Sequence, residues 1–223
     1  IDLPTDPRPA YQFIIDTVRA NPGEVTLVAV GRMTNLALAL KHDPEIASLV
    51  KGVVIMGGNF YVPGNVSPVA EANIHGDPEA ADLIMTASWK VVVVGLDVTG
   101  ATTMGRSYLA DMAKAGGPSV QLLSDLSQSY IDFYSHLVED GMMVHDSCAC
   151  VYVVAPELFD TIEGSVRVVC GGIADGQTII KPNGRHFPPG DWDSLPSQIV
   201  CTGIRSQQVV DLIRDVILDE GKH

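Results

Sequence analysis

Short apolar runs alternate with helical segments over the first hundred residues. Residues 25–30 and 53–56 are short hydrophobic runs, and 90–96 (KVVVVGL) continues in valine, which is typical of strands buried on both faces of a sheet. Between the strands, residues 11–20 place apolar side chains at helical spacing. The order strand, helix, strand, helix, strand predicts a parallel α/β sheet.

Capping and turn residues predict where the next helices begin. Thr34 can cap a helix over residues 36–42, and a short helical stretch is expected over 44–50. Asp77 is a capping carboxylate that precedes Pro78 at the first position of a helix, which is a well-formed helix start. The first hundred residues therefore predict a regular alternation of strands and helices.

The hydrophobic pattern changes in the C-terminal third. Segments that alternate or carry β-branched residues lie between Gly/Pro loops, which suggests a small antiparallel extension of the sheet. These segments are 165–169, 177–180 and 198–202, while helices are expected over 106–115, 118–139, from 145 or 147 to 154, and 207–218. With no internal repeat and no low-complexity linker, the pattern predicts one α/β domain over residues 1–223: a mostly parallel central sheet flanked by helices.

Composition and charge narrow the classes of partner. The chain has 223 residues, 46% of them hydrophobic and 18% charged, which is ordinary for a globular domain with a sizeable core. Its 14 basic and 27 acidic residues give a net charge of −13. Without a Lys/Arg cluster, nucleic acid and anionic membranes are not expected partners. The apolar runs are too short to span a bilayer and no signal peptide is evident, so we expect a cytoplasmic protein.

Four cysteines, Cys148, Cys150, Cys170 and Cys201, do not have the spacing of a zinc site. Three of them lie in apolar strand or helix patterns. Buried free thiols in a reducing compartment are therefore the favoured interpretation.

A long polar loop follows the second strand, over residues 56–78 (MGGNFYVPGNVSPVAEANIHGDP). If Ala72 is extended, Glu71 and Asn73 leave the chain on the same side. Together with Asn65 they offer two amides and a carboxylate, which suit a polyhydroxylated ligand. Gly64, next to Asn65, would let the backbone approach such a ligand closely. The alternative is a solvated surface loop, which composition alone favours.

Three stretches in this order resemble the nucleoside hydrolases, the inosine-uridine-preferring N-ribohydrolase family. They are TLVAVGRMTN at 26–35, MGG followed by GNVSPVAEAN within the loop, and VHDSCA at 144–149. The similarity runs over nearly the whole chain. It implies hydrolysis of the N-glycosidic bond of ribonucleosides by a Ca²⁺-bound water, in a homodimer or homotetramer.

The resemblance also implies a role for individual residues. Asp146 matches a metal-binding aspartate that also contacts the 3′-hydroxyl, and Val30 matches a position whose carbonyl binds the metal. Asn65 and Glu71 match the pair at the 5′-hydroxyl, and Asn73 matches the residue at the 2′-hydroxyl. From the residues alone, a helix N-cap is the favoured interpretation of Asp146, and Val30 is a core strand residue.

Further positions match the sugar and base pockets. Met56 would line the sugar pocket or fill the core, and His145 matches a histidine near the leaving base, although a structural role is common for such a residue. Phe133, Tyr134 and His136 lie where the family stacks on or protonates the base, with ordinary helix packing as the alternative. Ala72 replaces an aromatic residue found in many members, and Trp192 lies in a loop that could cover the site or form a surface turn.

Nothing in the chain matches the DxDxxxDD motif that supplies the family's other metal ligands and its general base. Asp2 and Asp6 lie in a segment similar to the loop after that motif. We therefore expect the chain to be the larger part of a nucleoside hydrolase, incomplete at its N-terminus and lacking the first strands.

Alone, such a chain should bind metal weakly and hydrolyse nothing. A non-catalytic nucleoside- or sugar-binding protein is the alternative. A dinucleotide-binding domain is disfavoured, because the glycines do not have G-x-G-x-x-G spacing.

Overall fold

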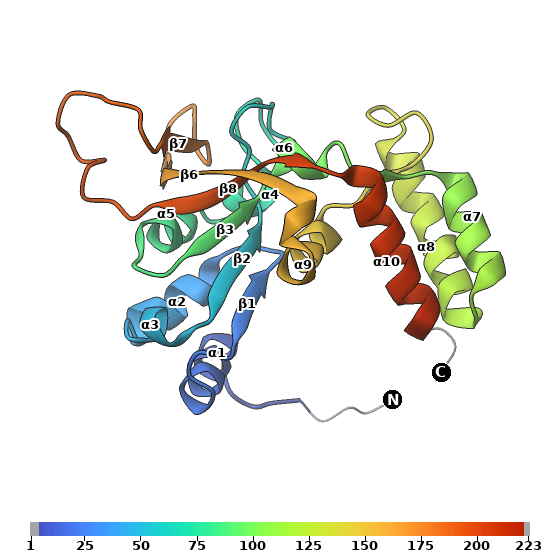
Figure 1. Cartoon of the computed structure of the whole chain (residues 1–223), viewed down its shortest axis with the longest axis horizontal. Coiled ribbons are helices and arrows are strands. Elements are labelled where there is room, and N and C mark those ends of the chain that lie inside the picture. Colours follow the sequence, from blue (N-terminus) through green and yellow to red (C-terminus); the bar gives the residue numbers. More distant parts are fainter. Residues whose placement is uncertain (1–4, 221–223) are drawn as a thin grey trace.

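The computed structural model describes residues 5–220, with side chains to residue 219, and has one large sheet (Figure 1). Within the described residues its six strands lie in the order β1 (Thr26–Ala29), β2 (Gly52–Met56), β3 (Val91–Val94), β8 (Gln198–Ile204), β6 (Phe159–Val168) and β7 (Thr178–Pro182). The first four strands are parallel, and β6 pairs antiparallel with both β8 and β7. The predicted α/β fold with an antiparallel C-terminal extension is confirmed.

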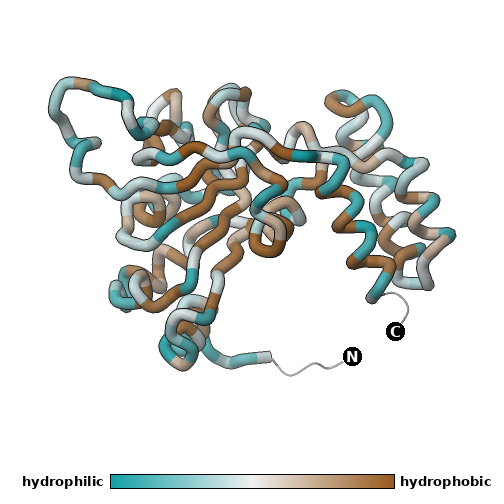
Figure 2. The backbone as a smooth tube through the Cα atoms, in the orientation of Figure 1, coloured by the Kyte–Doolittle hydropathy of each residue, from teal (hydrophilic) through white to brown (hydrophobic). Residues whose placement is uncertain are grey.

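Helices cover both faces of the sheet because its central strands are apolar on both sides. In β2, Val53 and Ile55 pack into one hydrophobic core, and Val54 and Met56 pack into the other. Figure 2 shows these strands as a continuous hydrophobic band. The first core is covered by α1 (Ala10–Ala20), α2 (Thr34–His42), α3 (Ile46–Leu49) and α5 (Pro78–Thr86), and the second by α9 (Asp146–Val154) and α10 (Ser206–Glu220).

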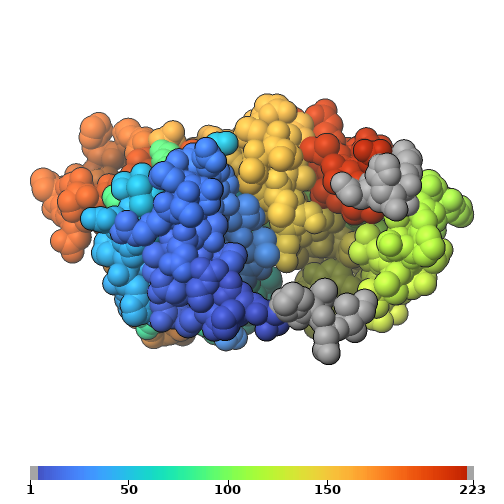
Figure 3. Space-filling model, turned by 90° about the horizontal axis from the view of Figure 1, so that it is seen from below, coloured from blue at the N-terminus to red at the C-terminus, as the bar shows by residue number. Residues whose placement is uncertain are grey.

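A helical hairpin stands beside the sheet and shares a small hydrophobic cluster with α10. It consists of α7 (Arg106–Ala115) and α8 (Pro118–Tyr134) and is joined to the body through the short strands β4 (Thr103–Met104) and β5 (Met142–Met143). Seen from below, this hairpin (green) and α1 (blue) lie on opposite sides of the molecule, with α9 between them (Figure 3).

Two predicted boundaries were wrong for identifiable reasons. The strand expected at 165–169 begins at Phe159, because cross-strand pairing with β8 recruits the polar residues before 165. The helix expected over 118–139 ends at Tyr134, where the Ser135 hydroxyl and N–H both bond to the carbonyl of Asp132 and close the last turn. In addition, β8 joins the parallel part of the sheet next to β3 rather than lying only at an antiparallel edge.

Two predictions about side chains were also wrong. Thr34 does not cap α2, because Met33 occupies the cap position and the Thr34 hydroxyl donates to Asp77 at the start of α5. Cys148 and Cys201 are buried free thiols, but Cys150 and Cys170 are exposed. Burial raises the pKa of both buried thiols to about 12, so these two are poor nucleophiles at neutral pH.

In the described part of the chain, β1 forms one end of the sheet and pairs only with β2. Val28 and Val30 on and after this strand are 39% and 40% exposed. No helix among residues 5–220 is long and apolar enough to cross a bilayer.

Candidate active site

The loop after β2 is closed by hydrogen bonds between its own backbone groups. The N–H of Gly64 donates to the carbonyl of Pro68 at 3.2 Å, and the N–H of Asn65 donates to the carbonyl of Ala70 at 3.1 Å. A Cβ on Gly64 would lie 2.2 Å from that Ala70 oxygen and 2.5 Å from the Ser67 oxygen. Gly64 is therefore required for the loop's own closure, and it also lines the cavity beside the loop, so its approach to a ligand stays a prediction.

Glu71 anchors the end of this loop to the end of β2. It is the N-cap of the short helix α4 (Ala72–His75), and its Oε2 accepts the N–H groups of Asn73 and Ile74 at 2.9 and 3.1 Å. The same oxygen accepts the N–H of Gly58, directly after β2, at 3.1 Å. The side chain is 2% exposed. One carboxylate oxygen therefore fixes both the helix start and the strand end.

The predicted geometry at Ala72 was wrong, because this residue begins α4 and is not extended. Glu71 and Asn73 nevertheless both reach the end of β2. The Nδ2 of Asn73 donates to the Met56 carbonyl at 3.0 Å and contacts its Sδ at 3.4 Å. The two side chains converge through these contacts with β2, and not through the alternation of an extended strand.

Burial raises the pKa of Glu71 above its ordinary value, against the three backbone N–H groups that favour the carboxylate, and the charge of Asp146 adds to the rise. Because the pKa of Glu71 is higher in the native state, the stability that Glu71 contributes is fully present below its unfolded-state pKa of 4.5. This contribution declines as the pH rises through the native-state pKa.

We therefore expect the difference in unfolding free energy between wild type and Glu71→Gln to shrink as pH rises above 4.5. Urea unfolding at a series of pH values measures this difference, in which the other carboxylates cancel. A constant or growing difference over that range would contradict the raised pKa.

A cavity of about 420 Å³ lies beside this loop. Residues from four separate segments line it, including Asn65, Asp97, Tyr134, Met143 and His145. Asn65 accepts the N–H of Ala72 through Oδ1 at 3.0 Å, which leaves its Nδ2 without a partner in the described chain. The structure therefore brings the predicted residues Asn65, Tyr134 and His145 to one cavity.

His145 and Asp146 lie at the N-terminus of α9, next to this cavity. His145 occupies the cap position, so Asp146 is the first helical residue and not the N-cap. The Nδ1 of His145 lies 2.8 Å from the hydroxyl of Thr99, and its Nε2 is buried without a partner among the described residues. Burial lowers the pKa of His145 and raises that of Asp146, and each opposes the shift of the other.

Asp146 is an exposed residue whose carboxylate is partly desolvated, and it lies near two other parts of the site. Its charge raises the pKa of Glu71, and it also contributes to the pKa of about 12 at Tyr130 on α8, which burial raises most. The loop after β2 and α8 therefore both lie close enough to Asp146, at the start of α9, for its charge to act on their side chains.

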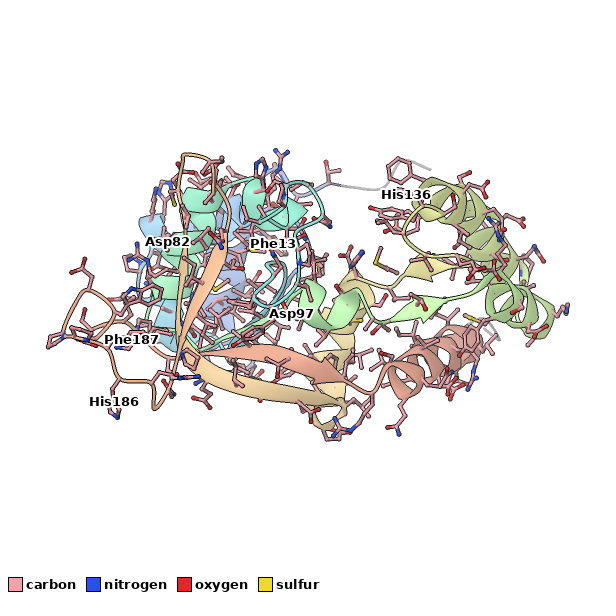
Figure 4. All side chains as sticks on the ribbon, turned by 90° about the horizontal axis from the view of Figure 1, so that it is seen from above. Phe13, Asp82, Asp97, His136, His186 and Phe187 are labelled. Atoms are coloured by element: carbon pink, nitrogen blue, oxygen red, sulfur yellow. The ribbon has the colours of Figure 1, made fainter. Side chains whose placement is uncertain are left out.

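The structure places the predicted residues Phe133, Tyr134 and His136 differently with respect to the cavity. Tyr134 lines the cavity, but Phe133 is 70% exposed and packs edge-on against the ring of Tyr134. His136 is also exposed and stacks on Tyr134 from the end of α8, where Figure 4 labels it. Phe133 and His136 are thus outside the cavity wall in this structure. The loop of Trp192 runs beside β7, and Figure 4 shows its residues His186 and Phe187 at the opposite end of the molecule from His136.

Asp97, Thr99 and Tyr130 contribute to the site but were not predicted. Asp97 lies on α6 (Leu96–Thr99), near the middle of the molecule in Figure 4, and accepts the N–H groups of Phe60 and Tyr61 at 2.9 and 2.7 Å. The available signal for Asp97 and Thr99 was their position just after β3, at the carboxyl end of a parallel strand.

The described residues do not fit a complete calcium site. Calcium takes six to eight oxygen ligands. Val30 follows β1, and Asp146 has a carboxylate that accepts no hydrogen bond from the described chain. Glu71 and Asp97, however, already accept backbone N–H groups. Within residues 5–220 no group of three Asp, Glu, His or Cys side chains could hold a metal ion. Asp2 lies outside the described residues, and Asp6 pairs with Arg8 at 2.6 Å.

A mostly parallel α/β sheet, with the loop after β2 and the start of α9 at one cavity, is the setting of this site. The family model for "inosine-uridine preferring nucleoside hydrolase" matches residues 2–211, so the chain belongs to this family. Its relatives include "Probable uridine nucleosidase 2" of Arabidopsis thaliana, which is 36% identical over 210 residues. That match covers 93% of this chain and 65% of the relative. The "Pyrimidine-specific ribonucleoside hydrolase RihB" of Escherichia coli O1:K1 / APEC is 38% identical over 173 residues, covering 76% of this chain and 55% of the relative.

Solved structures agree with this assignment. A "Plant nucleoside hydrolase - PpNRh1 enzyme" is 34% identical with a TM-score of 0.93, covering 98% of this chain and 69% of that one. A "Purine-Preferring Ribonucleoside Hydrolase from Gardnerella vaginalis" is 30% identical with a TM-score of 0.86, covering 100% of this chain and 71% of that one. The chain spans 65% and 55% of the length of the two curated relatives, the uridine nucleosidase and the RihB hydrolase.

Proposed function

We propose that this chain forms the ribose-binding part of a protein that hydrolyses the N-glycosidic bond of ribonucleosides. One structural observation carries the proposal beyond family membership. Around the end of β2, the described chain leaves Asn65 Nδ2, Asn73 Oδ1 and Glu71 Oε1 without hydrogen-bond partners. Hydroxyl groups both donate and accept, so a sugar can pair with one amide donor and two acceptors.

In this proposal, Asn65 and Glu71 hold the 5′-hydroxyl and Asn73 holds the 2′-hydroxyl. Met56 is 2% exposed and packs into the core under α9, so its carbonyl and sulfur act through Asn73. Asp146 would contact the 3′-hydroxyl, and Tyr134 and His145 would border the base. Preorganised contacts of this kind place the sugar without reorganising the loop.

The calcium ion implied by the family is a weaker part of the proposal. Val30 and Asp146 would be its ligands, but they supply too few oxygens for a complete site. We expect the 223-residue chain to bind Ca²⁺ only weakly, with a dissociation constant on the order of 10⁻³ M or above. Isothermal titration of the chain with CaCl₂ measures this affinity, and Asp146→Asn should lower it further.

The direct test is an assay of ribose release from uridine and inosine by the 223-residue chain with added calcium. We expect no release, because the described residues provide no free carboxylate cluster to activate water. Measurable release would contradict this expectation. The second candidate, a non-catalytic nucleoside- or sugar-binding protein, predicts ribose binding with no turnover even in the complete protein.

Assembly and location stay predictions, and the sequence predicts no preference between purine and pyrimidine bases. The homodimer or homotetramer implied by the resemblance can be tested by light scattering of the purified chain. A cytoplasmic location can be tested by fractionation of the source cells. The relatives' names include uridine, pyrimidine-specific and purine-preferring enzymes, so the complete protein should be assayed with nucleosides of both base classes.

A further inference from the structure

The short helix α6 connects both walls of the cavity. From its first turn, Asp97 holds the backbone of the loop after β2 through Phe60 and Tyr61. From its last residue, Thr99 reaches across to His145 at the start of α9. The function proposed above uses neither contact. The second one determines a property of His145 that bears on the ligand.

Thr99 is fully buried, and His145 is the single hydrogen-bond partner of its hydroxyl within the described chain. Other buried or half-buried threonines here behave differently. The Thr102 hydroxyl donates to the Val98 carbonyl at 3.1 Å, and the Thr86 hydroxyl donates to the Asp82 carbonyl at 2.7 Å. The Thr99 hydroxyl proton has no such carbonyl, so the imidazole is its available acceptor.

This geometry constrains the neutral imidazole ring. A neutral histidine carries its proton on one nitrogen and offers a lone pair on the other. If Thr99 donates to Nδ1, then Nδ1 is the acceptor and the ring proton lies on Nε2. In the opposite arrangement, Nδ1–H would donate to Thr99 and the hydroxyl proton would be buried without an acceptor, which is unfavourable.

We propose that Thr99 is a positioning residue that holds His145 in the Nε2–H form and so presents one hydrogen-bond donor beside the cavity. Nε2 is buried and has no protein partner, and His145 lines the cavity. A ligand that reached Nε2 would meet a donor there and would pair with it through an acceptor atom, such as a carbonyl oxygen or an unprotonated ring nitrogen of a nucleobase. This inference rests on the proposed function for its choice of ligand, but the tautomer itself does not.

The test is long-range ¹H–¹⁵N NMR of the imidazole groups in the 223-residue chain, at a pH well above the ordinary histidine pKa. His145→Asn assigns the signals. We expect wild type to show Nδ1 as the unprotonated nitrogen and Nε2 as the protonated one. Thr99→Ser, which keeps the hydroxyl, should retain this pattern. Thr99→Val should lose it and show the mixture of tautomers of an unconstrained ring.

Thr102→Val is the matched control, because it removes a buried hydroxyl that bonds to a carbonyl and not to His145. It should leave the His145 signals unchanged. A wild-type spectrum with Nδ1–H would overturn the proposal without any variant, and so would an unchanged tautomer in a folded Thr99→Val. Neither result depends on ribose binding, so failure of the proposed function and failure of this inference are distinguishable.

Discussion

Replacing Glu71 with alanine is expected to lower the free energy of unfolding by roughly 3–5 kcal/mol. The Oε2 atom of Glu71 accepts three N–H groups that have no other acceptor within the described chain, and the side chain is 2% exposed. Each buried donor left without a partner costs about 1–3 kcal/mol. Urea denaturation followed by circular dichroism measures the change.

The matched control is Glu139→Ala, because Glu139 is exposed in the segment after α8 and has no hydrogen bond in the described chain. It should change stability by no more than about 0.5 kcal/mol. Glu71→Gln, which keeps an oxygen of the same reach, should fall between the control and Glu71→Ala. If Glu71→Ala were as mild as the control, Glu71 would not anchor the loop.

Gly64→Ala should have the second largest effect, a loss of about 1–3 kcal/mol in unfolding free energy together with rearrangement of the loop. The added methyl group would lie 2.2 to 2.5 Å from backbone atoms of Ala70 and Ser67, which cannot move aside like a flexible side chain. Amide chemical shifts of residues 64–73 should change well beyond the mutated position. Stability and shifts can be measured on the same purified variant.

Gly52→Ala is the appropriate comparison, because a methyl group at Gly52 meets nothing within 4 Å. It should be neutral or slightly stabilising, since alanine lowers the entropy of the unfolded chain. If Gly64→Ala were also neutral, with loop shifts near those of wild type, the tight closure of this loop would be refuted.

The sheet could be predicted because its signal is local and strong. The valine run at 91–94 and the apolar residues of 53–56 are buried on both faces, and few other structures accommodate such runs. The C-terminal third was harder, since polar residues such as Asp160 and Glu163 enter β6 only because β8 pairs with them. The hydrophobic pattern therefore predicts that these strands exist, but it does not predict how long they are.

The site could be predicted only as a set of residues. Asn65 and Asn73 were candidates from the loop's own residues and His145 from the resemblance, but their arrangement depends on hydrogen bonds between distant segments. Glu71 to Gly58 spans 13 residues and Thr99 to His145 spans 46. No periodicity reports such contacts. For the same reason α4 and α6, which are four residues each, were missed although they carry the anchoring groups.

The central claim, a pentose site formed where the loop after β2 meets the start of α9, is tested most directly by NMR titration of the ¹⁵N-labelled chain with D-ribose. The account predicts saturable amide shifts that cluster at Asn65, Asn73 and residues 145–147. It is contradicted if ribose leaves these amides unchanged, or if the shifts lie instead in the groove beside β7 formed by Ile179, Phe187 and Trp192.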